Sequence, residues 1–224
     1  STVLSGFDLS CTGNSTAVSP IPNIGYVKVG TCGCSGADAA KFAEDIQAVI
    51  RNQDNANLKG WIVDLRGNGG GNMWPMLAGI SSVLGDGVVG HFIDPDNKEA
   101  KWSVTAGTSL YEGSVVNAVA NPYRLINPNP KVAVLLDQGC ASSGEAIAVA
   151  FIGRPKTMSF GVGTCGLSTA NATYFLSDGA QFQLTVSLMA DRNKVTKGGS
   201  IVPDVTVAGD KEVVNKAVEW INQP

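Results

Sequence analysis

Residues Lys131 to Thr169 read KVAVLLDQGCASSGEAIAVAFIGRPKTMSFGVGTCGLST, and this stretch decides the fold. Val132–Leu136 is a continuous apolar run, which is typical of a fully buried strand. A short polar turn follows, and the small apolar residues 146–152 then have the length of a helix. The order of strand, sharp turn and helix therefore places two serines, Ser142 and Ser143, beyond the carboxyl end of a buried strand.

These two serines have two interpretations. A hydroxyl at this place lies near the free N–H groups of a helix N-terminus, which can stabilise an oxyanion that forms beside a nucleophile. Serine is also a favoured N-cap residue, so Ser142 and Ser143 can simply cap the helix. The spacing alone favours the cap.

A second motif shifts the balance from the N-cap interpretation toward the nucleophile interpretation. Residues 61–71 read WIVDLRGNGGG, a buried strand that runs into a glycine-rich turn. Three consecutive glycines let the backbone adopt positive φ and approach a ligand closely. The N–H groups of such a turn can form an anion-binding nest, although glycines alone are equally consistent with a plain flexible turn.

Together the two motifs resemble those of the tail-specific, or C-terminal-processing, serine peptidases of the ClpP/crotonase-like superfamily. That family carries a DLRGNxGG turn and a later small-Ser-x-x-Glu turn, here Ala141–Glu145. The resemblance extends to a GxTxG-like loop at Gly163–Gly166 and to an I-x-P-D segment at Ile201–Asp204. It implies an α/β fold, a ClpP/crotonase-like superhelix of β-β-α units with a mainly parallel central sheet. It also implies that residues 1–224 are a single catalytic domain without a PDZ domain.

The resemblance implies a role for each site residue. Ser142, rather than Ser143, aligns with the nucleophile, and the backbone N–H groups of Gly69, Gly70 and Ser143 would be the oxyanion donors. Glu145 lies one helical turn beyond Ser142 and would orient the base or a neighbouring loop. Its alternative role is that of a first-turn carboxylate favoured by the helix dipole.

The general base is missing from the pattern. Many family members use a lysine directly after the GxTxG loop, where this chain has Gly166-Leu167. Another branch, which includes the nisin-resistance peptidases, uses a histidine well upstream of the DLRGN turn, and the Gly-Leu-Ser-Thr sequence here favours that branch. The only histidine is His91, on the predicted strand after the turn, and it is a candidate base, although a lone histidine on a strand is more often structural. We therefore expect either an upstream base-bearing segment outside this sequence, which we favour, or a site that has lost its base.

Length and composition limit the number of domains and the kinds of partner that the chain can have. The 224 residues are 44% apolar and 16% charged, with 16 basic and 19 acidic side chains, and this length suits one well-packed domain. No basic run points to nucleic acid, and no apolar run is long enough to cross a membrane. The start at Ser1, without a signal peptide, indicates a mature or trimmed product.

Five cysteines add a prediction about covalent links. No pair has C-x-x-C spacing and there is one histidine, so neither a metal nor another cofactor is expected. In the fold that the resemblance implies, Cys140 and Cys165 flank one active site and are predicted to form a disulfide. Cys11 could reach Cys32 or Cys34 and leave an odd thiol, and the alternative is five reduced, buried cysteines. Disulfides would indicate an extracytoplasmic location: periplasm, cell surface or exterior.

The rest of the chain predicts alternating strands and helices. The predicted strands are 2–9, 25–30, 61–65, 88–93, 102–105, 132–136, 157–160, 172–176 and 181–188. The predicted helices are 37–52, 73–84, 146–152 and 211–222. Residues 110–130 contain three prolines and are predicted to form a long surface excursion.

Two functions of different classes fit these residues. The first is a serine endopeptidase that cleaves exported polypeptides, often near a C-terminus, as the resemblance implies. The second is a non-catalytic ligand- or peptide-binding module on the same scaffold, as in the interphotoreceptor retinoid-binding proteins. Acyl-CoA chemistry of the crotonase type is a third, which the DLRGN turn and Ser142 argue against. A histidine-bearing segment upstream would separate the first two.

Overall fold

The chain alternates strands and helices along most of its length. The computed structural model describes residues 11–13, 15, 16, 18 and 20–224. Its elements are β1 (Ile24–Lys28), α1 (Gly36–Gln53), β2 (Gly60–Asp64), α2 (Met73–Leu84), β3 (Gly87–Ile93), β4 (Glu99–Thr105), β5 (Thr108–Tyr111), β6 (Ser114–Ala118), β7 (Lys131–Leu136), α3 (Ser143–Phe151), β8 (Thr157–Gly161), β9 (Thr169–Phe175), β10 (Gln181–Asp191), β11 (Val205–Thr206) and α4 (Asp210–Asn222).

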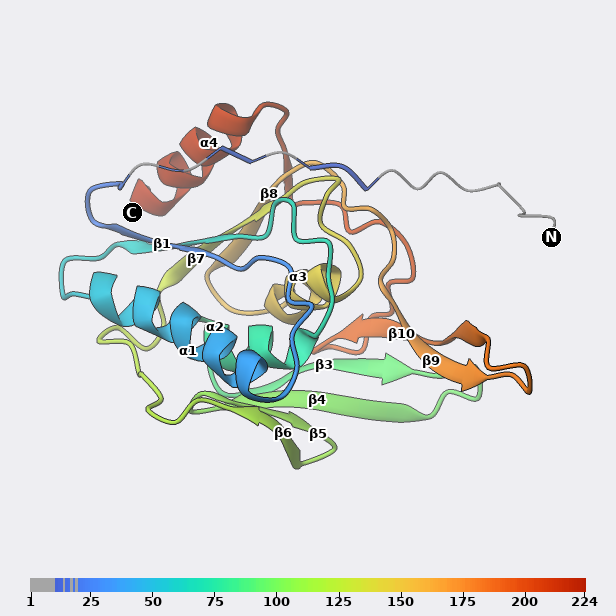
Figure 1. Cartoon of the computed structure of the whole chain (residues 1–224). Helices are drawn as coiled ribbons and strands as arrows, with labels where there is room; N and C mark the ends of the chain where they lie inside the picture. Colours follow the sequence, from blue (N-terminus) through green and yellow to red (C-terminus); the bar gives the residue numbers. More distant parts are fainter. Residues whose placement is uncertain (1–10, 14, 17, 19) are drawn as a thin grey trace.

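Two sheets and two helical layers are stacked (Figure 1). The parallel sheet has the strand order β1-β2-β7-β8-β11, and the antiparallel sheet has the order β6-β5-β4-β3-β10-β9. Helix α4 covers one face of the parallel sheet, while α1, α2 and α3 lie between the two sheets. This arrangement confirms the predicted α/β class with a mainly parallel central sheet.

The apolar runs of the central strands follow from burial on both faces. In β7, Ala133 and Leu135 pack toward α4, whereas Val132 and Val134 pack toward the helices between the sheets. Strand β2 is likewise buried at every position. A strand that is buried on both faces of its sheet has a continuous apolar sequence, which is why β2 and β7 can be identified from the sequence.

The structure differs from the expectation in one long segment. Residues 110–130 were predicted to be a surface excursion, but β5 and β6 occupy 108–118 and extend the antiparallel sheet from β4. All five side chains of β6 are at least partly exposed, because β6 is an edge strand, so no apolar alternation marks it. The predicted strand 2–9 lies outside the described residues.

None of the helices in the described part of the chain is both long enough and apolar enough to cross a membrane.

Candidate active site

The turn between β7 and α3, residues 137–143, is termed the serine turn. Ser142 is the residue before the first turn of α3, and its backbone has φ 52° and ψ −118°. An L-residue rarely adopts such angles, and they persist only where the surroundings enforce them. A strained serine on a sharp strand-to-helix turn is the local structure from which a nucleophilic hydroxyl projects in hydrolases.

The glycine turn, residues 67–71, packs directly against the serine turn. A Cβ added to Gly70 would lie 2.9 Å from both Ala141 O and Ser142 Cβ, so only glycine allows this approach. The hydroxyl of Ser143 donates a hydrogen bond to Gly71 O. The fold thus brings together the two motifs that are about 70 residues apart in the sequence, as parallel strands that end at one sheet edge require.

Two of the three predicted oxyanion donors already have partners. The Gly69 N–H donates to Thr31 Oγ1 at 2.9 Å, and the Gly70 N–H donates to Asn68 Oδ1 at 3.0 Å. Asn68 is fully buried, and its amide nitrogen in turn donates to Val29 O at 3.0 Å. These bonds fix the shape of the glycine turn but occupy the N–H groups of Gly69 and Gly70.

Two other N–H groups remain available at the same place. Ser143 opens α3, and its N–H has no acceptor within the described part of the chain, as expected for the first turn of a helix. The N–H of Gly71 likewise has no acceptor among residues 20–224. Gly71 was not among the predicted oxyanion donors; it follows Gly70 and precedes Asn72, whose side chain caps α2.

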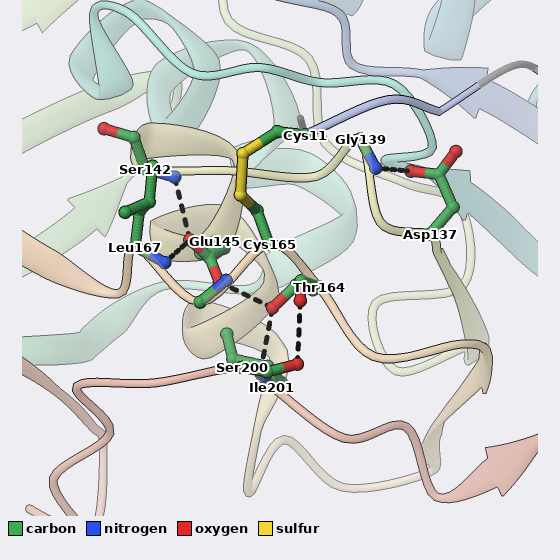
Figure 2. Close-up of a disulfide and its surroundings, with 11 residues drawn as sticks. Cys11, Asp137, Gly139, Ser142, Glu145, Thr164, Cys165, Leu167, Ser200 and Ile201 are labelled. Atoms are coloured by element: carbon green, nitrogen blue, oxygen red, sulfur yellow. Dashed lines mark hydrogen bonds between the residues drawn. A yellow bond between two sulfur atoms is a disulfide. The ribbon is translucent and has the colours of Figure 1, made fainter. Parts of the chain in front are cut away.

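Glu145 is the organising carboxylate of the site (Figure 2). It is completely buried, and its Oε2 accepts from the N–H groups of Ser142 at 2.9 Å and Leu167 at 2.7 Å. Its Oε1 accepts from the Thr164 hydroxyl at 2.5 Å and the Gly166 N–H at 2.9 Å. Glu145 therefore joins the serine turn to residues 163–167, which we term the threonine loop.

The threonine loop is held from its other side by the I-x-P-D segment. Thr164 Oγ1 accepts from the Ile201 N–H at 2.8 Å, and Ser200 Oγ donates to Thr164 O at 2.8 Å (Figure 2). Asp204 accepts from both the backbone and the hydroxyl of Ser159 in β8. All four motifs of the sequence therefore converge on one end of the parallel sheet.

The charged residues of the DLRGN motif form a buried ion pair. Arg66 donates to both oxygens of Asp64, at 2.9 Å and 2.6 Å, and Tyr26 Oη donates to Asp64 Oδ2 at 2.7 Å. Burial and the Asp64 charge raise the pKa of the Tyr26 hydroxyl well above its usual value. Arg66 also reaches the carboxylate of Asp210 at the start of α4. These residues stabilise the base of the glycine turn.

The predicted Cys140–Cys165 disulfide is wrong, and so is the predicted pairing of Cys11 with Cys32 or Cys34. Cys165 pairs with Cys11, with a Cα–Cα distance of 5.4 Å, and Cys32 pairs with Cys34 at 5.1 Å. The backbones of Cys140 and Cys165 are adjacent, since the Cys165 N–H donates to Cys140 O at 2.9 Å. The Cys140 side chain, however, is fully buried in the main hydrophobic core and remains a free thiol.

The environment of Cys140 disfavours the thiolate form of its side chain. Burial raises the pKa of Cys140 well above its ordinary value, and the negative charges of Glu145 and Asp137 raise it further. The thiolate is the reactive form of cysteine, so this side chain is protected from oxidation and exchange at neutral pH.

The Cys32–Cys34 link lies against the glycine turn. The Cys32 N–H donates to Gly70 O at 3.1 Å, and Cys32 O accepts from the Asn72 N–H at 2.7 Å. A Cβ on Gly71 would come within 2.2 Å of Cys32 O. The C-x-C spacing of Cys32 and Cys34 is the sequence signal for this link.

His91, the candidate base, lies in β3 of the antiparallel sheet. Its Nδ1 is 3.0 Å from Glu99 Oε1, without hydrogen-bond geometry, and Lys194 contacts the other oxygen of Glu99 at 2.7 Å. The Lys194 bond is the main reason that the pKa of Glu99 is lowered, with His91 adding to it. No contact among the described residues joins His91 to Ser142.

A basic partner for Ser142 and a metal site are both absent from the described residues. No hydrogen bond there joins Ser142 Oγ to a histidine, lysine or carboxylate side chain. Likewise, no group of three or more histidine, cysteine, aspartate and glutamate side chains in that part of the chain could hold a metal ion.

Comparison of the sequence with known proteins identifies a family and two relatives. The model of peptidase family S41 matches residues 23–207. The nisin-resistance protein of Lactococcus lactis subsp. lactis is 36% identical over 186 residues, which cover 83% of this chain and 56% of that protein. Carboxyl-terminal-processing peptidase 2 of Arabidopsis thaliana chloroplasts is 26% identical over 166 residues, covering 74% of this chain and 28% of the plant protein.

A solved structure shares the fold. A lipoprotein from Streptococcus agalactiae superposes with a TM-score of 0.73 at 24% identity, and the match covers 88% of this chain and 65% of that structure. This chain thus spans less than two thirds of each of these three proteins. The family match covers most of the chain and one relative exceeds one-third identity, so the chain belongs to peptidase family S41.

Proposed function

We propose that this chain is the catalytic domain of a serine endopeptidase that hydrolyses peptide bonds of extracytoplasmic polypeptides. The observation that carries the proposal is the enforced conformation of Ser142, with φ 52° and ψ −118°, between a buried strand and a helix N-terminus. Membership of peptidase family S41 supports the reaction class. The alternative of a non-catalytic binding module on the same scaffold is not favoured by any of these features.

The proposed reaction assigns each group a role. Ser142 Oγ attacks the peptide carbonyl carbon, and its proton passes to a base and then to the leaving amine as the C–N bond breaks. Water then hydrolyses the acyl ester on Ser142 and frees the hydroxyl. The N–H groups of Ser143 and Gly71 donate to the oxygen as it becomes negatively charged. Gly69 and Gly70 shape the turn, since their own N–H groups are engaged by Thr31 and Asn68.

The base comes from outside the described residues in this proposal. A serine hydroxyl without a base is a poor nucleophile at neutral pH. His91 instead belongs to the cluster with Glu99 and Lys194, which supports a structural role for its ring. The isolated 224-residue chain should therefore hydrolyse peptides far more slowly than the full natural chain.

Three further observations support the proposed location and substrate. Disulfides persist in oxidising compartments, so the Cys11–Cys165 and Cys32–Cys34 links support a place in the periplasm, at the cell surface or outside the cell. The similar streptococcal structure is that of a lipoprotein. The plant relative is named for carboxyl-terminal processing, which supports cleavage near C-terminal tails.

The test uses the full natural chain and an unfolded, disulfide-free protein as substrate. Ser142→Ala should lower kcat/KM by a factor of at least about 10³, because it removes the nucleophile. Ser143→Ala is the matched control, since it removes the neighbouring hydroxyl but keeps the backbone N–H. Ser142→Ala with unchanged turnover, or Ser143→Ala with the larger loss, would overturn the assignment.

A further inference from the structure

A short N-terminal segment crosses the catalytic end of the parallel sheet. This N-terminal strap comprises residues 11–16, of which 14 is not described. It starts at the disulfide to Cys165 (Figure 2) and passes over the serine turn, where a Cβ on Gly13 would lie 2.1 Å from Asp137 Oδ2. It then reaches α4, where the Thr16 N–H donates to Asp210 Oδ2 at 2.7 Å.

The strap is covalently attached to the threonine loop, between the two residues that bond to Glu145. Cys165 stands between Thr164 and Gly166, and both of these neighbours donate hydrogen bonds to Oε1 of Glu145. The other carboxylate oxygen of Glu145 holds the Ser142 N–H at 2.9 Å. The path from the disulfide to the nucleophile therefore runs through one side chain.

The same loop holds the serine turn at a second place. The Cys165 N–H donates to Cys140 O, two residues before Ser142. Gly139 is closely covered by the strap, since a Cβ there would come within 2.6 Å of Gly13 Cα. Loss of the disulfide would thus loosen the serine turn both from the threonine loop and from the strap.

We infer that the Cys11–Cys165 disulfide is a positioning element for Ser142, and that peptidase activity therefore depends on the redox state of this link. The inference rests on the proposed function and adds a regulation to it. The conformation of Ser142 is costly and persists only while its neighbours enforce it. When the link is broken, the serine turn relaxes and the hydroxyl leaves the geometry that attack requires.

The switching reaction balances with a dithiol as reductant. Its first thiolate attacks one sulfur of the Cys11–Cys165 link and forms a mixed disulfide, releasing the other cysteine as a thiol. Its second thiol then closes the oxidised reagent and releases the remaining cysteine. Two electrons and two protons pass to the protein, and a disulfide oxidant that takes them back by the same exchange re-forms the link. Cys140 takes no part, because its thiol is buried and protonated.

The experiment compares the full natural chain with Cys11→Ser/Cys165→Ser, which lacks the link and leaves no new thiol. Ser15→Ala is the matched control, because it alters the same strap and removes only the contact with Lys28. Turnover of a peptide substrate gives kcat and KM, and amide hydrogen exchange of residues 138–147 reports the serine turn independently of activity. Wild type is measured oxidised, reduced with dithiothreitol, and reoxidised. The double variant is also measured with and without dithiothreitol, because the reductant opens the Cys32–Cys34 link as well.

The double variant and reduced wild type should lose about tenfold or more in kcat with KM within about threefold, as misplacement of a catalytic group predicts. Exchange in 138–147 should speed up by about tenfold or more, while exchange in α1 stays within about twofold. Ser15→Ala should match wild type, and reoxidation should restore both readouts.

Two results would overturn the inference. If kcat and amide exchange are unchanged in the double variant, the Cys11–Cys165 link does not position the site. Loss of activity in Ser142→Ala would still support the proposed function in that case. Faster exchange spread evenly over the whole chain would make the link a general stabiliser. If no variant or wild type hydrolyses peptides, the proposed function fails, and the exchange data alone decide the positioning role.

Discussion

At Ser142, backbone strain on the order of 1–3 kcal/mol must be offset by neighbouring contacts. Glu145 supplies the central contact, because its two oxygens receive four hydrogen bonds from the serine turn and the threonine loop. A buried carboxylate with four donors is well satisfied and serves as a structural anchor. The sequence placed Glu145 in the site through its spacing from Ser142, but only the fold shows which loop it holds.

Glu145→Gln should therefore destabilise the protein by at least about 2 kcal/mol, because the new amide group faces donors and leaves buried N–H groups unpaired. Urea unfolding at pH 7 measures this change. Glu212→Gln is the control, since Glu212 is an exposed first-turn glutamate of α4, and it should stay within about 0.5 kcal/mol of wild type. Equal stability of the two variants would contradict the anchoring role.

Cys140 gives a second prediction at this scale. Its raised pKa and complete burial should keep it unreactive toward a thiol reagent at pH 8 in the native protein. Unfolding without reductant should expose one reactive thiol per chain, and peptide mapping should find Cys11 linked to Cys165. A Cys140–Cys165 linked peptide would show that the described pairing is wrong.

Among the elements, the central strands and the helices were the most predictable. Continuous apolar runs identified β2 and β7, and helix α2 was predicted at its observed bounds, Met73–Leu84. Strand β6 was missed because its exposed edge position removes the apolar pattern, and the two-residue β11 is too short to leave one. The Cys11 pairing was missed because it depends on the path of an irregular segment, for which periodicity carries no signal.

The close packing of the glycine turn against the serine turn predicts the effect of a side chain at Gly70. Gly70→Ala should cost about 1–3 kcal/mol of stability and most of the activity, because its Cβ meets Ala141 O and its φ of 101° disfavours a side chain. Gly33→Ala should change stability by less than about 1 kcal/mol, since nothing lies within 4 Å of its added Cβ. Thermal unfolding and peptide turnover compare the two, and similar effects would contradict the close packing of the two turns.

Across the whole molecule, ionic contacts tie α4 and the strap to the parallel sheet. Asp210 receives hydrogen bonds from Thr16 and pairs with Arg66, which is itself bonded to Asp64 in β2. Although partial burial alone would raise the pKa of Asp210, the Thr16 bonds and the Arg66 charge lower it overall. The strap, the last helix and the DLRGN motif thus share one charged network.

The lowered pKa of Asp210 predicts how the free energy of unfolding changes with pH. A carboxyl whose pKa is lower in the folded state stabilises the fold above its unfolded value, about 3.9, and loses that contribution as pH falls through the lower folded value. Asp210→Asn should thus be less stable at pH 7 and show a smaller loss of stability below about pH 4. Urea unfolding from pH 3 to 7 tests this, and parallel curves for variant and wild type would contradict it.

Ser142 as the nucleophile is tested most directly by covalent labelling of the full natural chain with a fluorophosphonate, followed by peptide mass mapping. The probe needs a nucleophilic serine and donors for the phosphonyl oxygen, so it reports both halves of the proposed site. We predict one adduct, on Ser142, that is absent in Ser142→Ala and present in Ser143→Ala. An adduct on Ser143, or no adduct in a folded protein that hydrolyses peptides, would contradict the account.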